Sequence, residues 1–304
     1  MTGPGTGADP DADGATEETG TSADTGSDTD GGSAGGGSLD LFEHLDAVRD
    51  RLAGAEGLLL CTDFDGTLAP ITDDPDAAGI TDANEDALRA LADREGVELA
   101  VVSGREVGDV TAQVGIEGIA YAGNHGLELR REGETTVHPI AAGRRDDIAA
   151  LLADLDDRLA GIEGLVFEDK GVTATIHYRG VDPEDHSAVE TAVEAALDKH
   201  DEGLSSSSGK EIFEVGPAIP WDKGRLISLL AEDAPRGWIG AYLGDDTTDE
   251  TAFEALGEAG LSVFVGEESE TTARYRVPDP NGVARFFEWL ASEGCEALGA
   301  AAGR

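Results

Sequence analysis

Two carboxylates, Asp63 and Asp65, are separated by one residue and follow the apolar residues 58–61. Side chains alternate along an extended chain, so these carboxylates point the same way at the end of a strand. Gly66 and Thr67 then let the backbone turn tightly enough for its N–H groups to face an anion. One carboxylate can attack an electrophile while the other handles protons. Open α/β sheets bind their ligands at such strand ends, which indicates a catalytic site.

The Asp-x-Asp spacing also arises by chance in a chain this acidic. It recurs within residues 9–30, where no apolar segment precedes it. An EF-hand calcium loop is disfavoured, because the acidic residues and glycines downstream lack its spacing. We therefore interpret only Asp63 and Asp65 as site residues.

A second predicted strand, residues 99–102, ends in Ser103-Gly104-Arg105. A hydroxyl and free N–H groups just after a strand suit phosphate oxygens. The alternative is an ordinary strand–helix turn in which Ser103 caps the helix. This segment alone does not decide between the two.

A third segment follows residues 241–243 and contains Asp245, Asp246 and Asp249. Clustered carboxylates coordinate a hard cation through oxygen, and Mg²⁺ is favoured over Zn²⁺ because neither His nor Cys is nearby. The alternative for Thr248 or Asp249 is to cap a helix. We predict Asp245 as a ligand, with either Asp246 or Asp249 as a further one.

Lysine is rare in this chain: of the 21 lysine and arginine residues, only four are lysines. Lys223 opens a predicted helix before the third segment, where its ammonium could neutralise phosphate and hold an aspartate nucleophile. Lys170 lies in a predicted turn and Lys210 precedes a predicted strand. Lys199 lies at a helix C-terminus, where the helix dipole alone explains it.

The histidines support a sugar or phosphate site more weakly than the carboxylates and lysines do. His125 lies in Gly-Asn-His-Gly, residues 123–126, at the exit of a predicted strand. We interpret His177 as a structural residue of another strand.

The elements that must position these residues alternate between strands and helices. Apolar residues recur at helical spacing over residues 41–52. We then expect strand 58–62, helix 82–94, strand 97–102, helix 106–114 and strand 119–122, and later helix 223–232, strand 238–243, helix 248–256, strand 261–265 and helix 283–291. This alternation predicts an α/β fold with a Rossmann-like parallel-sheet core, formed by residues 39–125 and 218–304.

Residues 126–217 follow a different pattern and predict an inserted α+β unit. We expect a hairpin at 127–131 and 135–140, helices near 144–160 and 183–200, and strands 165–168, 172–178 and 211–215. Residues 203–209, with four serines, are predicted to form a flexible loop.

The charge of the chain excludes several partners. The formal net charge is −43, spread over every segment. Nucleic acid and anionic lipid surfaces would repel this field, so a phosphate ligand needs a local cluster of positive charge or a metal. The acidity favours adaptation to a high-salt cytoplasm, and we expect a halophilic archaeon as the source.

Three further features of the sequence bear on where in the cell the protein acts. Residues 1–38 contain no Lys, Arg or aromatic residue, and we predict a disordered acidic tail there. We interpret Cys61 and Cys295 as free thiols. No segment has the roughly 18 uninterrupted apolar residues of a membrane helix, and no leader pattern opens the chain. We therefore expect a cytoplasmic protein.

Four motifs now stand in order along the chain. They are Asp-Phe-Asp-Gly-Thr after one strand, Ser-Gly-Arg after a second, a helix-opening lysine, and Gly-Asp-Asp-Thr-Thr-Asp-Glu after a third. Their order resembles that of the haloacid dehalogenase superfamily of phosphotransferases, with the inserted unit as a cap. More narrowly, the chain resembles the trehalose-6-phosphate phosphatase family. That narrower resemblance rests on residues 122–126, 168–171, 177–179, 209–210 and 213–215.

The resemblance implies a role for each motif. Asp63 would be the nucleophile that forms an aspartyl-phosphate, and Asp65 the general acid and base. Mg²⁺ would bridge Asp63, the Asp65 carbonyl and Asp245. Phosphate binding is implied for Ser103, Gly104 and Lys223, and substrate binding for Arg105, Asn124, His125, Glu168, Lys170, Lys210 and Glu214. We also expect a monomer that is functionally coupled to a trehalose-6-phosphate synthase.

Two departures from the family pattern leave other functions open. Gly216 stands where the family typically has arginine, and Asp222 where asparagine is common. One alternative is a phosphatase of another sugar phosphate, such as sucrose or glucosylglycerol phosphate. An alternative of another class is a non-catalytic sugar-phosphate sensor.

Overall fold

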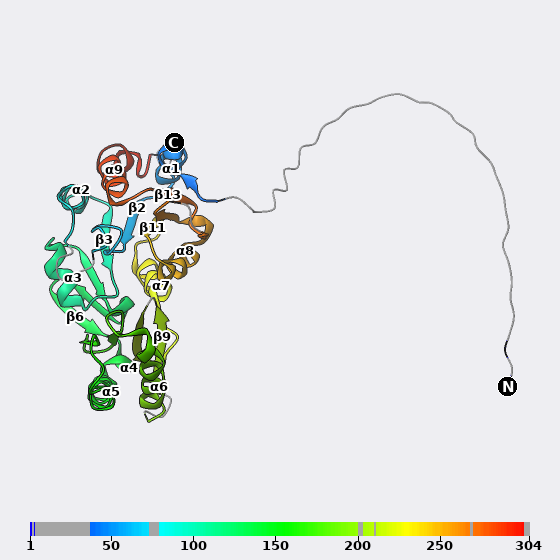
Figure 1. The fold of residues 1–304 in the computed structure, drawn as a ribbon. Coiled ribbons are helices and arrows are strands. Elements are labelled where there is room, and N and C mark those ends of the chain that lie inside the picture. The colour runs from blue at the N-terminus through cyan, green and yellow to red at the C-terminus, as the bar shows by residue number, and fades with distance from the viewer. Residues whose placement is uncertain are drawn as a thin grey trace. The chain divides into compact units, whose positions relative to one another are not determined.

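A nine-stranded sheet with helices on both faces carries the three motif segments (Figure 1). The computed structural model describes Met1, Gly3 and residues 37–72, 79–199, 203–209, 211–267 and 270–300. Every element below belongs to the unit Gly37–Arg304. Most of the predicted tail, residues 1–38, lies outside the described residues, as does Lys210.

The strand order of the large sheet is β1-β13-β12-β11-β2-β3-β4-β5-β6. Pairing is parallel from β1 to β4 and antiparallel from β4 to β6. The strands are β1 (Leu39–Asp40), β2 (Gly57–Thr62), β3 (Val97–Val102), β4 (Ala120–Gly123), β5 (Glu128–Arg131), β6 (Glu134–Val137), β11 (Trp238–Gly244), β12 (Leu261–Val265) and β13 (Tyr275–Val277). The α/β prediction is confirmed, although the pattern did not reveal the short strands β1 and β13.

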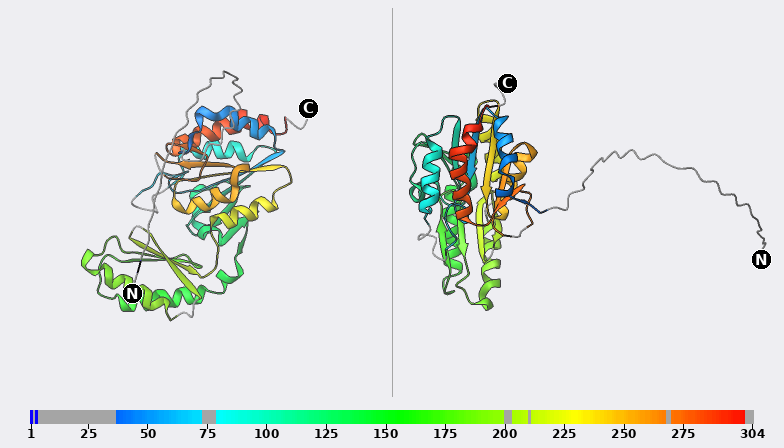
Figure 2. Two further views of the ribbon diagram at one scale, coloured as in Figure 1. Left: turned by 90° about the vertical axis from the view of Figure 1, so that its right-hand side faces the viewer. Right: turned by 90° about the horizontal axis from the view of Figure 1, so that it is seen from above.

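Alternation along β2 sends its side chains to two buried layers. Leu58 and Leu60 pack into the layer of α1, α2, α3 and α9, whereas Leu59 and Cys61 pack into the layer of α7 and α8. Because both faces are covered, the strand reads as a continuous apolar run. Figure 2 shows these helices on the two faces of the sheet. They are α1 (Leu45–Ala53), α2 (Asp82–Ala92), α3 (Val107–Val114), α7 (Lys223–Asp233), α8 (Glu250–Leu256) and α9 (Pro280–Trp289).

A smaller antiparallel sheet has the order β7-β8-β10-β9 and its own apolar core. Its strands are β7 (Val166–Asp169), β8 (Ala174–His177), β9 (Leu204–Gly209) and β10 (Ile212–Pro217), and helices α5 (Arg145–Arg158) and α6 (His186–Leu197) pack on one face. The remaining α-helices are α4 (Pro139–Ala142) and α10 (Cys295–Ala297). None of the helices that the structure describes is long and apolar enough to span a membrane. We use the word cap for this smaller sheet with α5 and α6.

Two expectations about the inserted unit are wrong. The hairpin β5–β6 extends the large sheet, whereas we expected it in the unit beginning at residue 126. Left-handed Asn124 and His125, with φ of 50° and 55°, reverse the chain so that β5 runs back along β4. Residues 203–209, which we predicted to form a flexible loop, instead contain strand β9. The backbone of β9 pairs with β10, and Leu204 is the one residue of this segment that is both apolar and buried.

Candidate active site

The carboxyl ends of three neighbouring strands meet at one edge of the sheet. β11, β2 and β3 are adjacent and parallel. Asp63 continues β2, and its N–H donates to the carbonyl oxygen of Leu243 on β11 (2.8 Å). The segments that begin with Asp63, Ser103 and Asp245 therefore start side by side.

Lys223 is buried at the first position of α7, where Asp222 caps the helix by accepting from the Arg225 N–H (2.8 Å). The ammonium lies 3.0 Å from Asp63 Oδ1 and 2.6 Å from Asp249 Oδ1. Burial alone would lower the pKa of Lys223, but these carboxylates raise it above its usual value. The site therefore holds a fixed positive charge against Asp63.

Asp249 is fully buried and uses both carboxylate oxygens. Oδ1 accepts from Lys223 and from the Tyr242 hydroxyl (2.6 Å), and Oδ2 accepts from the Asp246 N–H (3.0 Å). The Asp246 carboxylate accepts from the Thr247 N–H (2.7 Å) and from the Asp249 N–H, and with the bond from the Asp246 N–H to Asp249 this forms a capping box on the short helix Thr247–Asp249. The helix-cap alternative for Asp249 is thus realised in the structure, and Asp246 caps the same turn.

Asp63, Asp245 and Asp249 form an acidic cluster, with one oxygen of each within 4.8 Å of the others. Burial, and then the charge of Asp249, raises the pKa of Asp245 to about 7. Burial also raises the pKa of Asp63 well above its usual value. The oxygens of Asp63 and Asp245, with neither His nor Cys in the cluster, fit a hard divalent cation, whereas those of Asp249 already accept from protein donors.

Gly66 makes room for this cluster. Its φ is +76°, and a Cβ atom there would lie 2.0 Å from Asp245 Oδ2. The turn after Asp65 therefore needs glycine both for its backbone conformation and for space.

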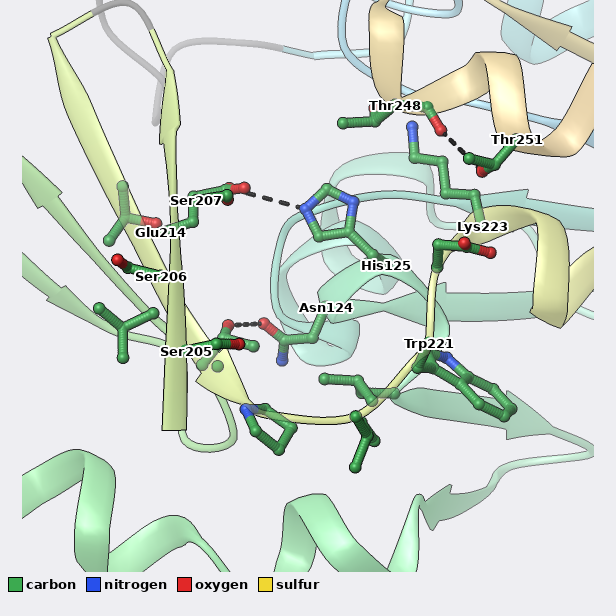
Figure 3. Close-up of a pocket in the computed structure, with 18 residues that line it drawn as sticks. Asn124, His125, Ser205, Ser206, Ser207, Glu214, Trp221, Lys223, Thr248 and Thr251 are labelled. Carbon is green, nitrogen blue, oxygen red and sulfur yellow. Dashed lines mark hydrogen bonds and ion pairs between the residues drawn. The ribbon is translucent and has the colours of Figure 1, made fainter. Parts of the chain in front are cut away.

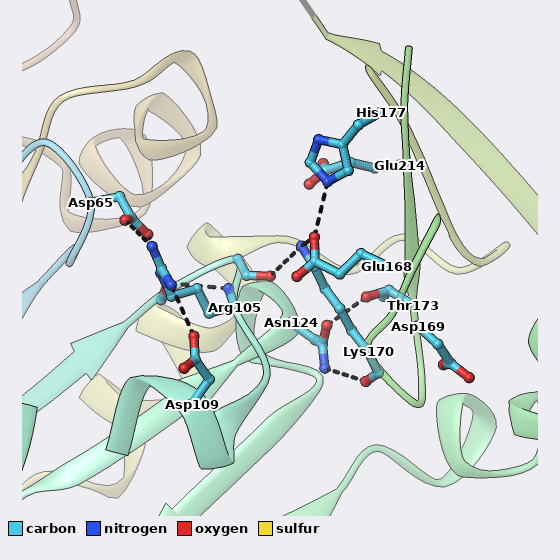
Figure 4. Close-up of polar contacts among 12 residues, drawn as sticks. Asp65, Arg105, Asp109, Asn124, Glu168, Asp169, Lys170, Thr173, His177 and Glu214 are labelled. Carbon is cyan, nitrogen blue, oxygen red and sulfur yellow. Dashed lines mark hydrogen bonds and ion pairs between the residues drawn. The ribbon is translucent and has the colours of Figure 1, made fainter. Parts of the chain in front are cut away.

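Arg105 binds Asp65 rather than facing the cavity (Figure 4). Its Nε and Nη2 donate to the two oxygens of Asp65 (2.8 and 2.7 Å), and Nη1 donates to Asp109 (2.9 Å). The hydrogen bond to Asp65 is the main cause of the raised pKa of Arg105. Arg105 was expected to bind substrate; in this structure it orients the carboxylate of Asp65.

Asn124, another expected substrate residue, is buried and joins the core to the cap. Its Nδ2 donates to Glu128 Oε2 (2.9 Å) and to the Lys170 carbonyl oxygen (3.2 Å), and its Oδ1 accepts from the Thr173 hydroxyl (2.5 Å). Both N–H donors of the side chain are therefore used and its oxygen accepts one hydrogen bond, while the residue also lines the cavity between the cap and the core.

Lys170 reaches from the cap to the core. Its Nζ donates to the Gly104 carbonyl oxygen (3.2 Å) and lies 3.8 Å from Glu168 Oε2. Glu168 also lies 3.1 Å from Nε2 of His177, so this histidine borders the expected sugar residues and not only the strand (Figure 4). The cap cation and the Ser-Gly-Arg turn are thus in direct contact.

A cavity of about 350 Å³ lies between the cap and the core (Figure 3). Lys223 and His125 line it from the core, and Glu214 and Thr175 from the cap. His125 Nε2 lies 3.6 Å from Glu214 Oε1, and this neighbour outweighs burial and lowers the pKa of Glu214 to about 2. Glu214 is therefore an ionised acceptor at neutral pH.

Sequence reasoning missed three residues of this site. Tyr242 reads as a buried strand residue, and nothing in the pattern shows that its hydroxyl binds Asp249. The hydroxyl of Thr67 lies 3.3 Å from Asp245 Oδ1, a contact that its place directly after Gly66 could have suggested. Asp109 follows Arg105 at i+4 spacing, which would have indicated an ion pair.

Comparisons with known proteins agree with this geometry. The sequence model of the trehalose-phosphatase family matches residues 61–281. The chain is similar to the trehalose-phosphate phosphatase of Mycobacterium marinum, with 37% identity over 240 residues, which are 76% of this chain and 60% of that protein. The chain thus spans about three fifths of the length of such curated relatives.

Solved structures show the same fold. The C-terminal domain of Candida albicans trehalose-6-phosphate phosphatase aligns with a TM-score of 0.69 and 22% identity, over 85% of this chain and 99% of that one. A haloacid dehalogenase-like hydrolase from Bacteroides thetaiotaomicron aligns with a TM-score of 0.56 and 17% identity, over 77% and 99%. The fold is of the haloacid dehalogenase type, and the chain belongs to the trehalose-phosphatase family.

Proposed function

We propose that the chain is a Mg²⁺-dependent phosphatase that hydrolyses trehalose 6-phosphate to trehalose and phosphate. The observation that carries this proposal is the buried Lys223 ammonium, 3.0 Å from Asp63 at a strand end and also lining the cavity beneath the cap. A sugar phosphate in that cavity would place its phosphate at the lysine and its sugar against the cap.

In the first step an oxygen of Asp63 attacks phosphorus, and the bond from phosphorus to the sugar oxygen breaks. Asp65 gives its proton to the departing sugar oxygen, so that trehalose leaves as the neutral alcohol. Lys223 holds the attacking carboxylate and offsets charge on the phosphoryl group, with Ser103 and Gly104 as further phosphate-binding residues. The product of this step is an aspartyl-phosphate.

In the second step Asp65 takes a proton from water, which attacks phosphorus and releases phosphate from Asp63. Mg²⁺, held by Asp63, Asp245 and the Asp65 carbonyl, would supply charge neutralisation at the phosphoryl oxygens. Asp249, whose oxygens are occupied by protein donors, would hold Lys223 in place.

We propose that the cap determines the sugar. Glu168, Lys170 and Glu214 offer two carboxylates and one ammonium to sugar hydroxyls, and His125 lies beside Glu214. Lys210, which lies outside the described residues, is a further proposed substrate residue. The segment between β6 and α7 would then determine substrate specificity. This unit begins later in the chain than the expected boundary at residue 126.

Phosphate release from a sugar-phosphate panel tests this function. Trehalose 6-phosphate should be hydrolysed with the highest kcat/KM when Mg²⁺ and molar KCl are present, and sucrose and glucosylglycerol phosphates more slowly. Asp63→Asn hardly changes volume and should retain the fold while losing turnover. An inactive wild-type protein that still binds the sugar phosphate would identify a sensor instead.

We also propose that the chain is adapted to molar salt, as in a halophilic archaeon. The net charge of −43 supports this, because at molar salt a Debye length of about 3 Å screens carboxylate repulsion. Thermal unfolding should occur at a markedly higher temperature in molar KCl than in dilute buffer. Equal unfolding temperatures would contradict the proposal.

For its cellular setting we propose a cytoplasmic monomer. Trehalose 6-phosphate has to be supplied by a reaction that joins two sugars, which supports functional coupling to a trehalose-6-phosphate synthase. Sedimentation in molar KCl tests the monomer, and a faster coupled rate with the synthase present tests the coupling.

A further inference from the structure

Tyr242 is fully buried in β11 and has an apolar ring and a polar hydroxyl in different surroundings. The ring packs in the layer between the sheet and helices α7 and α8, where it meets the ring of Phe253 edge to face, with centroids 5.8 Å apart. Phenylalanine would pack in the same way, because only the ring takes part in this contact. The hydroxyl therefore needs a separate explanation.

The hydroxyl of Tyr242 donates a 2.6 Å hydrogen bond to Oδ1 of Asp249. The same oxygen accepts from the Lys223 ammonium, also at 2.6 Å, and that ammonium lies 3.0 Å from Asp63. Hydrogen bonds to an ionised carboxylate are among the stronger ones in proteins. A continuous series of such contacts thus leads from the tyrosine through Asp249 and Lys223 to the proposed nucleophile.

Gly244 gives the Asp249 carboxylate its place beside this hydroxyl. Residues 242 and 244 point to the same face of β11, because side chains alternate along a strand. A Cβ atom at position 244 would lie 2.3 Å from Cγ of Asp249, so the carboxylate occupies the space that a side chain would take. The Asp246 N–H holds the second oxygen at 3.0 Å. The strand and the turn after it therefore orient this carboxylate toward the tyrosine.

The start of helix α7 is held against the segment that carries Asp249. A Cβ atom at Gly224 would lie 2.3 Å from the carbonyl oxygen of Thr251, and the Gly224 N–H donates to the Thr251 hydroxyl (3.1 Å). The backbone on both sides of the pair between Lys223 and Asp249 is thus closely packed. The position of the ammonium then depends on how the Asp249 carboxylate is oriented.

The same hydroxyl affects the acidic cluster. One oxygen each of Asp63, Asp245 and Asp249 lies within 4.8 Å of the others. The hydroxyl hydrogen points at this cluster and uses one acceptor position of Asp249. Removing it would make the cluster more negative and free that acceptor position for a cation.

We propose that Tyr242 is a positioning residue, whose hydroxyl keeps Asp249 bound to Lys223 instead of to the cation and so holds the ammonium against Asp63. The inference rests on the proposed phosphatase function and adds a residue that acts through another one. Without the hydroxyl, Asp249 would turn partly toward the cation, the ammonium would lose its fixed place, and attack by Asp63 would slow.

The test compares Tyr242→Phe with Tyr121→Phe as the matched control. Tyr121 is buried in the layer on the other face of the sheet, and its hydroxyl donates to the carbonyl oxygen of Ile116 and accepts from its N–H. At saturating Mg²⁺, Tyr242→Phe should lower kcat about 10-fold or more on both trehalose 6-phosphate and p-nitrophenyl phosphate, with KM changed less than about threefold. Tyr121→Phe should have the kcat of wild type.

Calorimetric titration with Mg²⁺ supplies a readout that does not depend on turnover. Tyr242→Phe should bind Mg²⁺ about threefold or more tightly than wild type, because the cluster loses a hydrogen-bond donor. A general loss of structure would weaken cation binding and turnover together, whereas loss of positioning shifts them in opposite directions. Tyr121→Phe should bind Mg²⁺ like wild type.

A double-mutant cycle shows whether Tyr242 acts through Asp249. In a protein that already carries Asp249→Ala, adding Tyr242→Phe should change kcat and Mg²⁺ affinity by less than about twofold, whereas independent effects would multiply. Multiplied effects would overturn the proposal.

Three other results would also overturn it. They are a loss of kcat in Tyr121→Phe equal to that in Tyr242→Phe, Mg²⁺ binding by Tyr242→Phe that is unchanged or weaker, and a Tyr242→Phe protein that does not fold although Tyr121→Phe does. If the wild type hydrolyses neither ester, the phosphatase function fails, and the Mg²⁺ titrations alone decide whether Tyr242 keeps Asp249 from the cation.

Discussion

The ammonium of Lys170 donates a 3.2 Å hydrogen bond to the carbonyl oxygen of Gly104. A cation of the cap thus contacts the turn that we propose binds phosphate. We therefore expect Lys170, unlike the cap carboxylates, to affect phosphate binding as well as sugar binding.

Glu168→Ala and Glu214→Ala should lower kcat/KM for trehalose 6-phosphate by about 10–100-fold, because each removes a group proposed to bind sugar hydroxyls. Hydrolysis of p-nitrophenyl phosphate should change little, since that ester has no sugar. Lys170→Ala should weaken hydrolysis of both esters. Steady-state kinetics on the two substrates checks this, and equal losses for all three variants would place the carboxylates in the catalytic centre or in folding.

Asn124→Ala should destabilise the protein by about 2–4 kcal/mol, because it removes three hydrogen bonds and leaves buried partners unpaired. The exposed Asn281 supplies the control, and Asn281→Ala should have an unfolding temperature near that of wild type. Thermal unfolding followed by circular dichroism makes the comparison. Equal stability of the two variants would show that Asn124 does not join the cap to the core.

Gly66→Ala should abolish cation binding and turnover, because the new methyl group would collide with the Asp245 carboxylate and displace it. Gly133→Ala is the matched control, since Gly133 also has a positive φ, of +83°, but no atom within 4 Å of the added Cβ. Both variants incur backbone strain, and only the first collides with the site. Calorimetric titration with Mg²⁺ distinguishes them, and tight binding by Gly66→Ala would refute the assigned cation site.

The metal-free protein should lose stability as pH rises through about 7, the raised pKa of Asp245. Between the ordinary pKa of an aspartate, near 4, and this value, the folded state binds more protons than the unfolded state, so unfolding free energy falls as pH rises. Mg²⁺ requires the ionised carboxylate, so its affinity should increase over the same range. Unfolding temperatures of wild type and Asp245→Asn from pH 5 to 8 test this, because the difference between them should depend on pH; a constant difference would contradict it.

The parallel core could be predicted from the sequence because its strands are buried on both faces and alternate with amphipathic helices. For this reason β2 contains the apolar run Leu-Leu-Leu-Cys. The motif residues come immediately after the ends of such strands, so their positions could be predicted as well. Strand β9 could not be predicted, since its four serines carry no β signal and its backbone pairing with β10 defines it. The sequence also did not show which sheet the β5–β6 hairpin joins, because its pairing with β4 depends on the turn at Asn124 and His125.

Residue types revealed the acidic cluster, but not which side chains remain free for a ligand. Arg105 has the chemistry to bind a sugar phosphate, yet in the structure it pairs with Asp65, and both N–H donors of Asn124 go to Glu128 and the cap turn. Tyr242 looked apolar by position and supports Asp249 instead. Such assignments depend on contacts between segments far apart in the chain, which spacing does not encode.

The most direct test of the account is to trap phosphate on Asp63. Wild-type protein mixed with trehalose 6-phosphate and Mg²⁺ is quenched in acid within the first turnover, and the peptide containing residue 63 is analysed by mass spectrometry. We expect one added phosphoryl group on Asp63 in the wild type, more of it in Asp65→Asn and none in Asp63→Asn. Rapid phosphate release with an unmodified peptide in every sample, or normal turnover by Asp63→Asn, would contradict the covalent mechanism.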